Sequence, residues 1–184
     1  MLRRIASVFT AAAALACAHA PIAQTPAETV IAVVSRDILL HAKEAPEGTY
    51  LLIETQTRTF ELTEQDFRHA VESGIPLGLL RQLLAEHPHR VAFPSGTREF
   101  RPVTPSAIAR IFANGPWWDR FYRRFPNSRG FVGFCGPVFN RDATEALIGV
   151  DYNCFGDCGW GGIVHLQRQD GKWVRLHEWL LYIS

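Results

Sequence analysis

Residues 162–183 read GIVHLQRQDGKWVRLHEWLLYI. Two runs of this stretch, 162–168 and 173–183, are rich in β-branched, aromatic and other apolar residues, and the pair Asp170-Gly171 lies between them. An Asp-Gly pair between two such runs is the strongest short-range signal of a β-hairpin. The stretch therefore predicts two antiparallel strands joined by a tight turn.

Two further runs typical of strands precede this hairpin, at residues 131–139 and 145–153. Turn-forming residues separate the two runs at 140–144, and a glycine-rich loop at 154–161 leads into the hairpin. Strands joined by such short connections usually pair with their neighbours in sequence. We therefore expect a four-stranded antiparallel meander in the C-terminal half.

The N-terminal half carries mainly helical patterns. An amphipathic stripe runs along residues 28–41, and Thr63 followed by Asp66 is typical of a helix N-cap. Further helices are expected at 77–86, 106–112 and 116–124, and strands at 50–57 and 98–103. This order predicts an α+β fold, in which N-terminal helices with one or two strands pack on one face of the meander. We expect a single α+β domain over residues 28–184.

The first residues have the pattern of a secretory signal. Arg3 and Arg4 are followed by an uncharged, mostly apolar segment, residues 5–15, and then by small residues. About eleven apolar residues are too few to span a bilayer, which takes roughly 20. We expect either cleavage after Ala18, which makes residues 1–18 the signal peptide, or lipidation of Cys17, which makes it residues 1–16. The protein is then exported to the periplasm of a bacterium, or anchored in the outer membrane as a lipoprotein.

Residues 19–27, HAPIAQTPA, show no hydrophobic periodicity and are expected to form a flexible tether. Removing Arg3 and Arg4 with the leader leaves 17 of the 19 basic residues against 18 acidic ones. A nearly neutral chain lacks the basic surface that binds nucleic acid. We therefore expect no nucleic-acid partner, and contact with a membrane only through a lipid on Cys17.

Cys154 and Cys158 bracket a short glycine-containing turn. In an oxidising compartment such a pair most simply forms a disulfide, which would stabilise the fold by about 2 kcal/mol in the chain-entropy model. A zinc site would need two further ligands, and a redox motif favours C-x-x-C at a helix N-terminus. We therefore predict a disulfide, with a metal site, a redox site and free thiols as the alternatives.

Cys135 lies in the expected strand at residues 131–139. As a nucleophile it would need a base, and His165 is the nearest candidate. In a meander these two residues lie on the first and third strands, about 9–10 Å apart, which is too far for a direct hydrogen bond. The favoured interpretation of Cys135 is a buried, inert thiol.

His165 and His177 raise the question of a metal site. If Asp170-Gly171 is a two-residue turn, His165 lies opposite Leu176 and His177 lies opposite Val164. The two imidazoles then point to opposite faces of the sheet and cannot share an ion, whereas a three-residue turn would change this register. We predict no metal and no cofactor.

Residues 117–125 predict a helix in which aromatic and charged residues are interspersed. The simpler interpretation is a helix that packs its rings on the sheet and keeps its arginines at the rim. The alternative is a platform for a sugar ring or an anionic ligand. The candidate ligand-binding residues are Trp160, Arg123, Arg124 and Arg129.

Several short motifs follow one another in the C-terminal half: Trp118-Asp-Arg-Phe-Tyr122, Phe125-Pro-Asn-Ser128-Arg-Gly130, Phe134, Phe139-Asn140, Cys154-Phe-Gly-Asp-Cys158-Gly159 and Gly171-Lys172-Trp173. Over residues 117–184 they resemble an uncharacterised bacterial family of exported proteins and lipoproteins with W-x-x-F-Y, Y-P-x-S-x-G, F-S-x-V-G-F-N, C-G-x-x-C-G and G-K-W elements. Cys135 stands where that family often has Ser, and Gly136-Pro137-Val138 interrupts its V-G pattern. The resemblance implies export and a shared fold, implies no activity, and speaks against an essential nucleophile at Cys135.

The sequence contains none of the motifs G-x-S-x-G, H-E-x-x-H, the P-loop or the dinucleotide fingerprint. The leading hypothesis is therefore a non-enzymatic binding or interaction module of the cell envelope, with a small molecule or an envelope protein as its partner. One alternative is a periplasmic hydrolase with a pocket between helices and sheet, using Cys135, His165 or Asp157. Another is thiol–disulfide exchange at Cys154 and Cys158. No catalytic residue is assigned.

Overall fold

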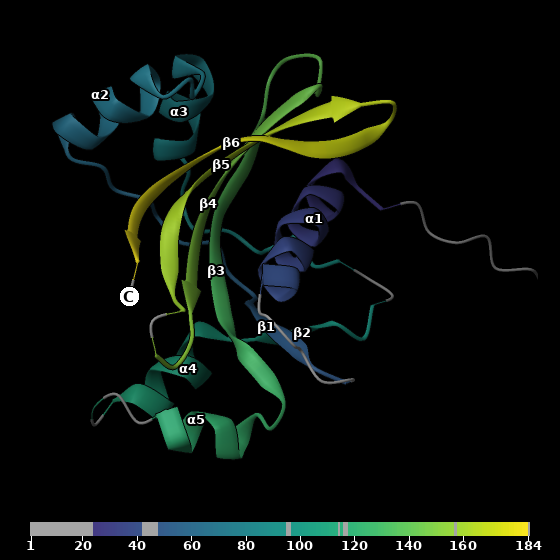
Figure 1. Cartoon of the computed structure of the whole chain (residues 1–184), viewed down its shortest axis with the longest axis vertical. Coiled ribbons are helices and arrows are strands. Elements are labelled where there is room, and N and C mark those ends of the chain that lie inside the picture. Colours follow the sequence, from purple (N-terminus) through teal and green to yellow (C-terminus); the bar gives the residue numbers. More distant parts are fainter. Residues whose placement is uncertain are drawn as a thin grey trace, which may run out of the picture.

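The described part of the chain is built around a six-stranded mixed sheet with the order β2-β1-β3-β4-β5-β6 (Figure 1). This computed structural model describes residues 24–41, 48–94, 97–113, 115, 118–156 and 158–183. The leader with Cys17, residues 19–23 of the expected tether, Trp117 and Asp157 lie outside the described residues. The strands are β1 (Tyr50–Glu54), β2 (Phe100–Val103), β3 (Ser128–Phe139), β4 (Glu145–Asn153), β5 (Trp160–Gln169) and β6 (Lys172–Ile183).

A four-stranded antiparallel meander is the wrong description of this sheet. Strands β3 to β6 do pair antiparallel with their sequence neighbours, but β1 and β2 belong to the same sheet. β1 runs parallel to both β2 and β3. All five residues of β1 are buried, which is typical of a parallel strand covered on both faces. Because parallel neighbours need a long crossover, helices lie between β1 and β2.

The hairpin at Asp170-Gly171 is confirmed. Gln169 pairs with Lys172, and the two turn residues have φ values of 49° and 77°. Positive φ at both central positions is the conformation of a type I′ turn, which Asp-Gly favours. The two strands of this hairpin, β5 and β6, form the end of the sheet farthest from β2.

Within the described ranges, five helices surround the sheet: α1 (Pro26–His41), α2 (Glu64–Glu72), α3 (Leu77–Leu84), α4 (Pro105–Phe112) and α5 (Trp118–Arg124). The predicted N-cap of α2 is confirmed, since the Thr63 hydroxyl accepts from the Asp66 backbone N–H at 3.1 Å. α1 begins at Pro26, inside the stretch expected to be a tether. Its start is explained by reciprocal hydrogen bonds between Thr25 and Glu28, a capping box with proline at the first helical position.

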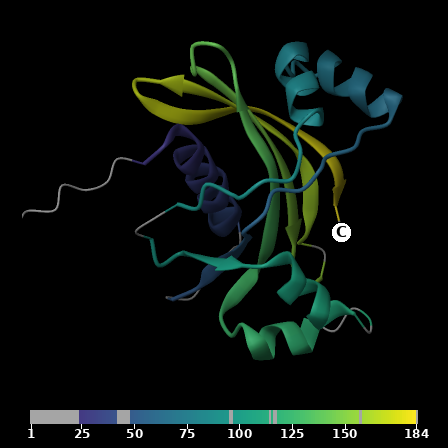
Figure 2. The ribbon, with the colours of Figure 1, turned by 180° about the vertical axis from the view of Figure 1, so that it is seen from behind.

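The helices cover both faces of the sheet, so the expectation that they pack on one face is also wrong. α1 packs on one face through Ile31, Val34 and their neighbours. The other face is covered by α2 and α3 at one end and by α4 and α5 at the other (Figures 1 and 2). Both faces need cover because the long central strands β3 and β4 bury side chains in both directions.

Candidate functional site

A row of four paired residues crosses the sheet between the two helix pairs. Gly133 on β3 pairs with Asp151 on β4, which pairs with Gly161 on β5, which pairs with Tyr182 on β6. We call these four residues the cross-sheet row. Because its two glycines have no side chain, other side chains can lie directly on the backbone at these positions. A Cβ at Gly133 would lie 2.3 Å from Arg58 Nε, and one at Gly161 would lie 2.1 Å from Tyr182 Cε1.

Arg58 occupies the space over Gly133. Its Nε donates to Glu54 Oε2 at 2.7 Å, and its Nη2 donates to Glu54 Oε1 at 2.8 Å. Its Nη1 donates to Asp151 Oδ2. A bidentate pair of this kind fixes the plane of the guanidinium. The Arg58 backbone N–H also donates to the Phe134 carbonyl at 2.7 Å, so this loop residue is held on the sheet at both ends.

Asp151 links the arginine to the edge strand. Its Oδ1 accepts from the Tyr182 hydroxyl and from Asn153 Nδ2, the latter at 2.9 Å. Burial raises the pKa of Tyr182, and the nearby Arg58 guanidinium partly offsets that rise. The phenol is therefore protonated at neutral pH and acts as the donor to Asp151. We call Glu54, Arg58, Asp151 and Tyr182 the Arg58 cluster.

A cavity of about 360 Å³ opens beside the Arg58 cluster. Arg58, Asp151 and Tyr182 form its polar wall. Its other walls are mainly apolar, and Phe60 lies over Gly149, where a Cβ would be 2.9 Å from the ring. The remaining lining residues are Thr59, Glu61, Gly133, Phe134, Cys135, Val150 and Leu181. We call this space the Arg58 cavity, and a second cavity of about 600 Å³ adjoins it through Arg58 and Thr59.

Cys135 lines the Arg58 cavity but has the properties of an inert thiol. The residue is buried, and its Sγ donates to the Leu83 carbonyl at 3.6 Å. Burial, together with the charge of Glu86, raises the pKa of Cys135 to about 11. β4 lies between its strand and that of His165. The thiolate that a nucleophile requires is therefore scarce at neutral pH, in agreement with the favoured interpretation.

His165 and His177 face each other, so the predicted register between them is wrong. The two-residue turn holds the expected pairing as far as Leu166 with Arg175, but an irregularity follows and His165 then pairs with His177. The irregularity has the form of a β-bulge that adds Leu176 to β6. Its physical reason is the core, because the added residue turns Trp179 toward the α2–α3 side, where it packs.

The two imidazoles stack with ring centroids 5.9 Å apart. His165 is 4 % exposed, and among the described residues neither of its ring nitrogens has a hydrogen-bond partner. Glu145 Oε2 lies 3.7 Å from its Nε2. Burial lowers the pKa of His165, with Glu145 raising it and His177 lowering it further. Within the described part of the chain, no group of three or more His, Cys, Asp or Glu residues could hold a metal ion.

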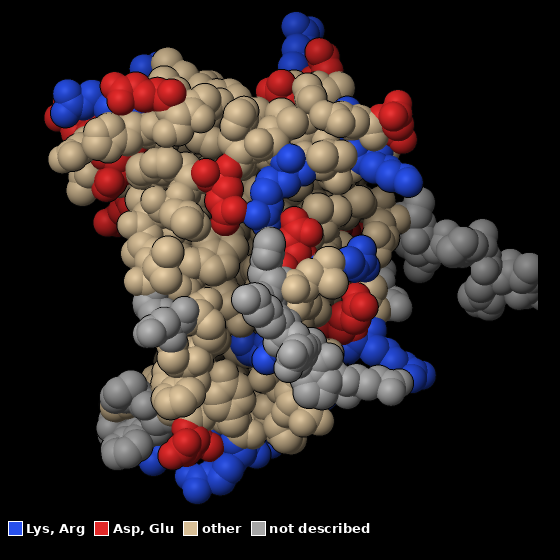
Figure 3. Space-filling view, viewed as in Figure 1, with Lys and Arg blue, Asp and Glu red and all other residues tan. Residues whose placement is uncertain are grey.

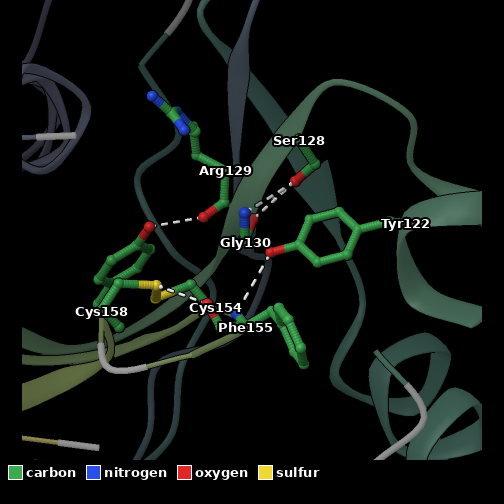
Figure 4. Close-up of a disulfide and its surroundings, with 8 residues drawn as sticks. Tyr122, Ser128, Arg129, Gly130, Cys154, Phe155 and Cys158 are labelled. Atoms are coloured by element: carbon green, nitrogen blue, oxygen red, sulfur yellow. Dashed lines mark hydrogen bonds between the residues drawn. A yellow bond between two sulfur atoms is a disulfide. The ribbon is translucent and has the colours of Figure 1, made fainter. Parts of the chain in front are cut away.

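The predicted disulfide between Cys154 and Cys158 is present, with the two Cα atoms 5.9 Å apart (Figure 4). The loop that it closes is fixed to α5, because the Phe155 N–H donates to the Tyr122 hydroxyl at 3.3 Å. Nearby, the Tyr152 hydroxyl donates to the Arg129 carbonyl at 2.5 Å. The first contact joins the β4–β5 connection to α5, and the second joins the end of β4 to the start of β3.

The four predicted ligand-binding residues do not line one common cavity. Trp160 lines a space of about 280 Å³ on the α1 side, which we call the Trp160 cavity, together with Ile38, Cys158, Gly159, Arg175, Glu178, Leu180 and Ile183. Arg123 and Arg124 are exposed in the last turn of α5, where basic side chains gather at that end of the molecule (Figure 3). Arg129 is half-buried on β3. The ring of Trp118 stacks on those of Tyr122 and Phe131, and the ring of Phe121 packs edge-on or tilted against all three, as the packing interpretation predicts.

Sequence reasoning missed the Arg58 cluster. Arg58, Asp151 and Tyr182 belong to no sequence motif, and nothing in the spacing of these three residues connects them. The available signal was the pair of glycines, Gly133 and Gly161, on strands that flank Asp151. A glycine inside a strand often marks a close approach of another group.

Among the described residues, no helix is long and apolar enough to cross a bilayer. Comparison of the chain with models of protein families, with curated proteins and with solved structures gives no match in any of the three.

Proposed function

We propose that this chain is an exported protein of the bacterial cell envelope that acts as a non-enzymatic binding module. The leader pattern of residues 1–18 supports export. The disulfide between Cys154 and Cys158 supports an oxidising compartment, since such bonds persist there and are rare in the cytosol. With a lipid on Cys17 the module would stay on the outer membrane, and with cleavage after Ala18 it would move freely in the periplasm.

The Arg58 cavity is the proposed binding site, and its lining carries the proposal. A mainly apolar pocket with a few convergent polar groups is the usual form of a small-ligand site. Glu54, Glu61 and Asp151 place three carboxylates in or beside the cavity against the single guanidinium of Arg58. Because this balance is acidic, the cavity favours a ligand group that is positively charged, and it disfavours an anion.

The apolar walls specify the rest of the ligand. Phe60 and Tyr182 place aromatic rings beside the carboxylates, and the face of such a ring attracts a cation in addition to apolar groups. The proposed ligand is therefore an apolar or aromatic body that carries an ammonium or guanidinium group. A hydrolase acting through Cys135 is disfavoured, because the pKa of its thiol is raised to about 11.

The test compares phenethylamine, 2-phenylethanol and phenylacetate, which share a ring and differ in charge, by isothermal titration calorimetry. Phenethylamine is expected to bind more tightly than the other two. Asp151→Asn and Glu61→Gln should each remove that preference, while Glu72→Gln, which changes an exposed carboxylate on α2, should keep it. Equal or tighter binding of phenylacetate, or no binding of phenethylamine, would contradict the proposal.

A further inference from the structure

β6 is an edge strand that is long and partly apolar. Among the described residues its twelve residues pair only with β5, and no other labelled helix or strand lies beyond its C-terminal half in Figure 1. The exposed large apolar residues of this strand are Val174, Leu176, Leu180, Tyr182 and Ile183. An edge with unpaired backbone groups can pair with another extended chain.

The last four residues of β6 separate two cavities. Leu181 and Tyr182 line the Arg58 cavity on one face of the sheet. Leu180 and Ile183, which are 46 % and 69 % exposed, line the Trp160 cavity on the other face. The same stretch of edge strand therefore has a pocket on each side.

We propose that this edge binds an extended segment of a partner protein, which adds one strand to the sheet beside β6. Successive side chains of a strand point to opposite faces, so alternate side chains of the added segment would point toward the two cavities, at the rims that β6 forms. In this binding mode the main chain supplies affinity and the pockets supply specificity. The inference rests on the proposed function, because it names the partner of the Arg58 cavity.

The charges of the two cavities specify the segment. The Arg58 cavity is acidic, as Glu61 and Asp151 line it with Arg58, and Arg58 is already paired with the buried Glu54. In the Trp160 cavity, Arg175 pairs with Glu178 at 2.6 Å and also with Asp37 of α1 at 3.2 Å, so no unpaired positive charge faces the apolar Ile38 and Trp160. Complementary charge favours specific partners and opposes like-charged ones. The fitting segment therefore alternates basic and apolar residues.

The test uses three capped peptides of nine residues: one that alternates Lys and Val, one of the same composition with Lys and Val in separate blocks, and one that alternates Glu and Val. Fluorescence anisotropy with the purified protein measures the Kd of each. The alternating Lys-Val peptide should bind at least about tenfold more tightly than either control, the ratio typical of one desolvated charge pair. N-methylation of every second amide of that peptide should remove binding, because it blocks pairing with a strand.

Two protein variants test whether each cavity contributes to peptide binding. Glu61→Gln and Ile183→Ser, one for each cavity, should each weaken binding of the alternating peptide. Leu77→Ser, at an exposed leucine on α3, serves as the matched control and should leave the Kd unchanged. Near-UV circular dichroism confirms that each variant is folded.

The outcomes separate this inference from the proposed function. Suppose that phenethylamine binds, and that the alternating Lys-Val peptide binds no more tightly than the peptide with Lys and Val in separate blocks. The peptide inference is then wrong, and the cavity remains a small-ligand site. If neither binds, both are wrong. If sedimentation velocity shows a dimer that Ile183→Ser dissociates, a second copy of this chain occupies the edge, and the partner-segment inference is overturned.

Discussion

The Tyr182 hydroxyl donates a hydrogen bond to the Asp151 carboxylate across Gly161. The ring of Tyr182 crosses a position where a Cβ would lie 2.1 Å from its Cε1. Edge strand β6 is thereby tied to central strand β4 through the site itself, over an intervening strand with no side chain at that position.

Substitution of the two glycines of the cross-sheet row should have graded effects. Gly133→Ala forces Arg58 away from the buried Glu54 and should cost about 3 kcal/mol of unfolding free energy. Gly161→Ala displaces only the partly exposed Tyr182 and should cost about 1 kcal/mol, the value of one hydrogen bond. Gly78→Ala is the control, since open space surrounds this helical position, and it should be neutral or stabilising. Urea unfolding measures all three, and equal costs at the three positions would contradict the crossing geometry.

Arg58 should matter to stability mainly because of the carboxylate that it covers. Glu54 is 2 % exposed, so Arg58→Met leaves an unpaired buried charge. The expected cost is about 3 kcal/mol, near the low end for buried pairs because the Arg58 side chain is 36 % exposed. The double variant Glu54→Leu with Arg58→Met removes that charge and should recover most of the loss. A double variant as unstable as the single one would show that the ion pair is not the cause.

Because of His165, the native protein should become less stable as the pH is lowered. Burial lowers the pKa of His165 below its ordinary value, so near pH 6 this imidazole is protonated to a greater extent in the unfolded chain than in the native protein. Protonation therefore favours the unfolded state as the pH falls through the ordinary imidazole pKa of about 6.5, and the free energy of unfolding decreases. His165→Leu should flatten thermal stability between about pH 7 and 5. His87→Gln, at an exposed histidine, should leave the pH dependence as it is, and an unchanged profile in His165→Leu would refute the assignment.

Cys135 should resist alkylation in the native protein. With its pKa raised to about 11, only a small fraction is thiolate at pH 8, and the residue is buried. Iodoacetamide should therefore leave it unmodified for hours in the native state and modify it rapidly in urea, as followed by mass spectrometry. Rapid modification of the native protein would restore Cys135 as a candidate nucleophile.

Features that depend on neighbouring residues could be predicted from the sequence. The Asp170-Gly171 turn, the Thr63 cap and the disulfide all rest on local chemistry. The parallel pairing of β1 with β3 joins residues far apart in the chain, such as Leu52 and Phe131, and no local pattern encodes it. The capping box at Thr25 and Glu28 was a local signal, but the Pro/Ala composition around it favoured a tether.

The site escaped prediction for the same reason. The pairing of Asp151 with Tyr182 depends on register across three strands, and two irregularities in the β5–β6 ladder change that register. One added residue in β6 was enough to bring His165 and His177 to the same face. Arg58 lies in a loop after β1, where neither helical nor strand periodicity marks a functional side chain.

The mixed sheet also has a consequence for the order of folding. β3 to β6 are joined by short connections, and such local contacts form early, whereas pairing of β1 with β3 must first close a long loop. We expect pulse-labelled hydrogen exchange to protect the amides of β4 and β5 before those of β1. Because Glu54 ends β1 and Arg58 follows it, the acidic cavity would then be assembled in the final stage of folding, and a partly folded chain would carry the edge strand without the pocket beside it.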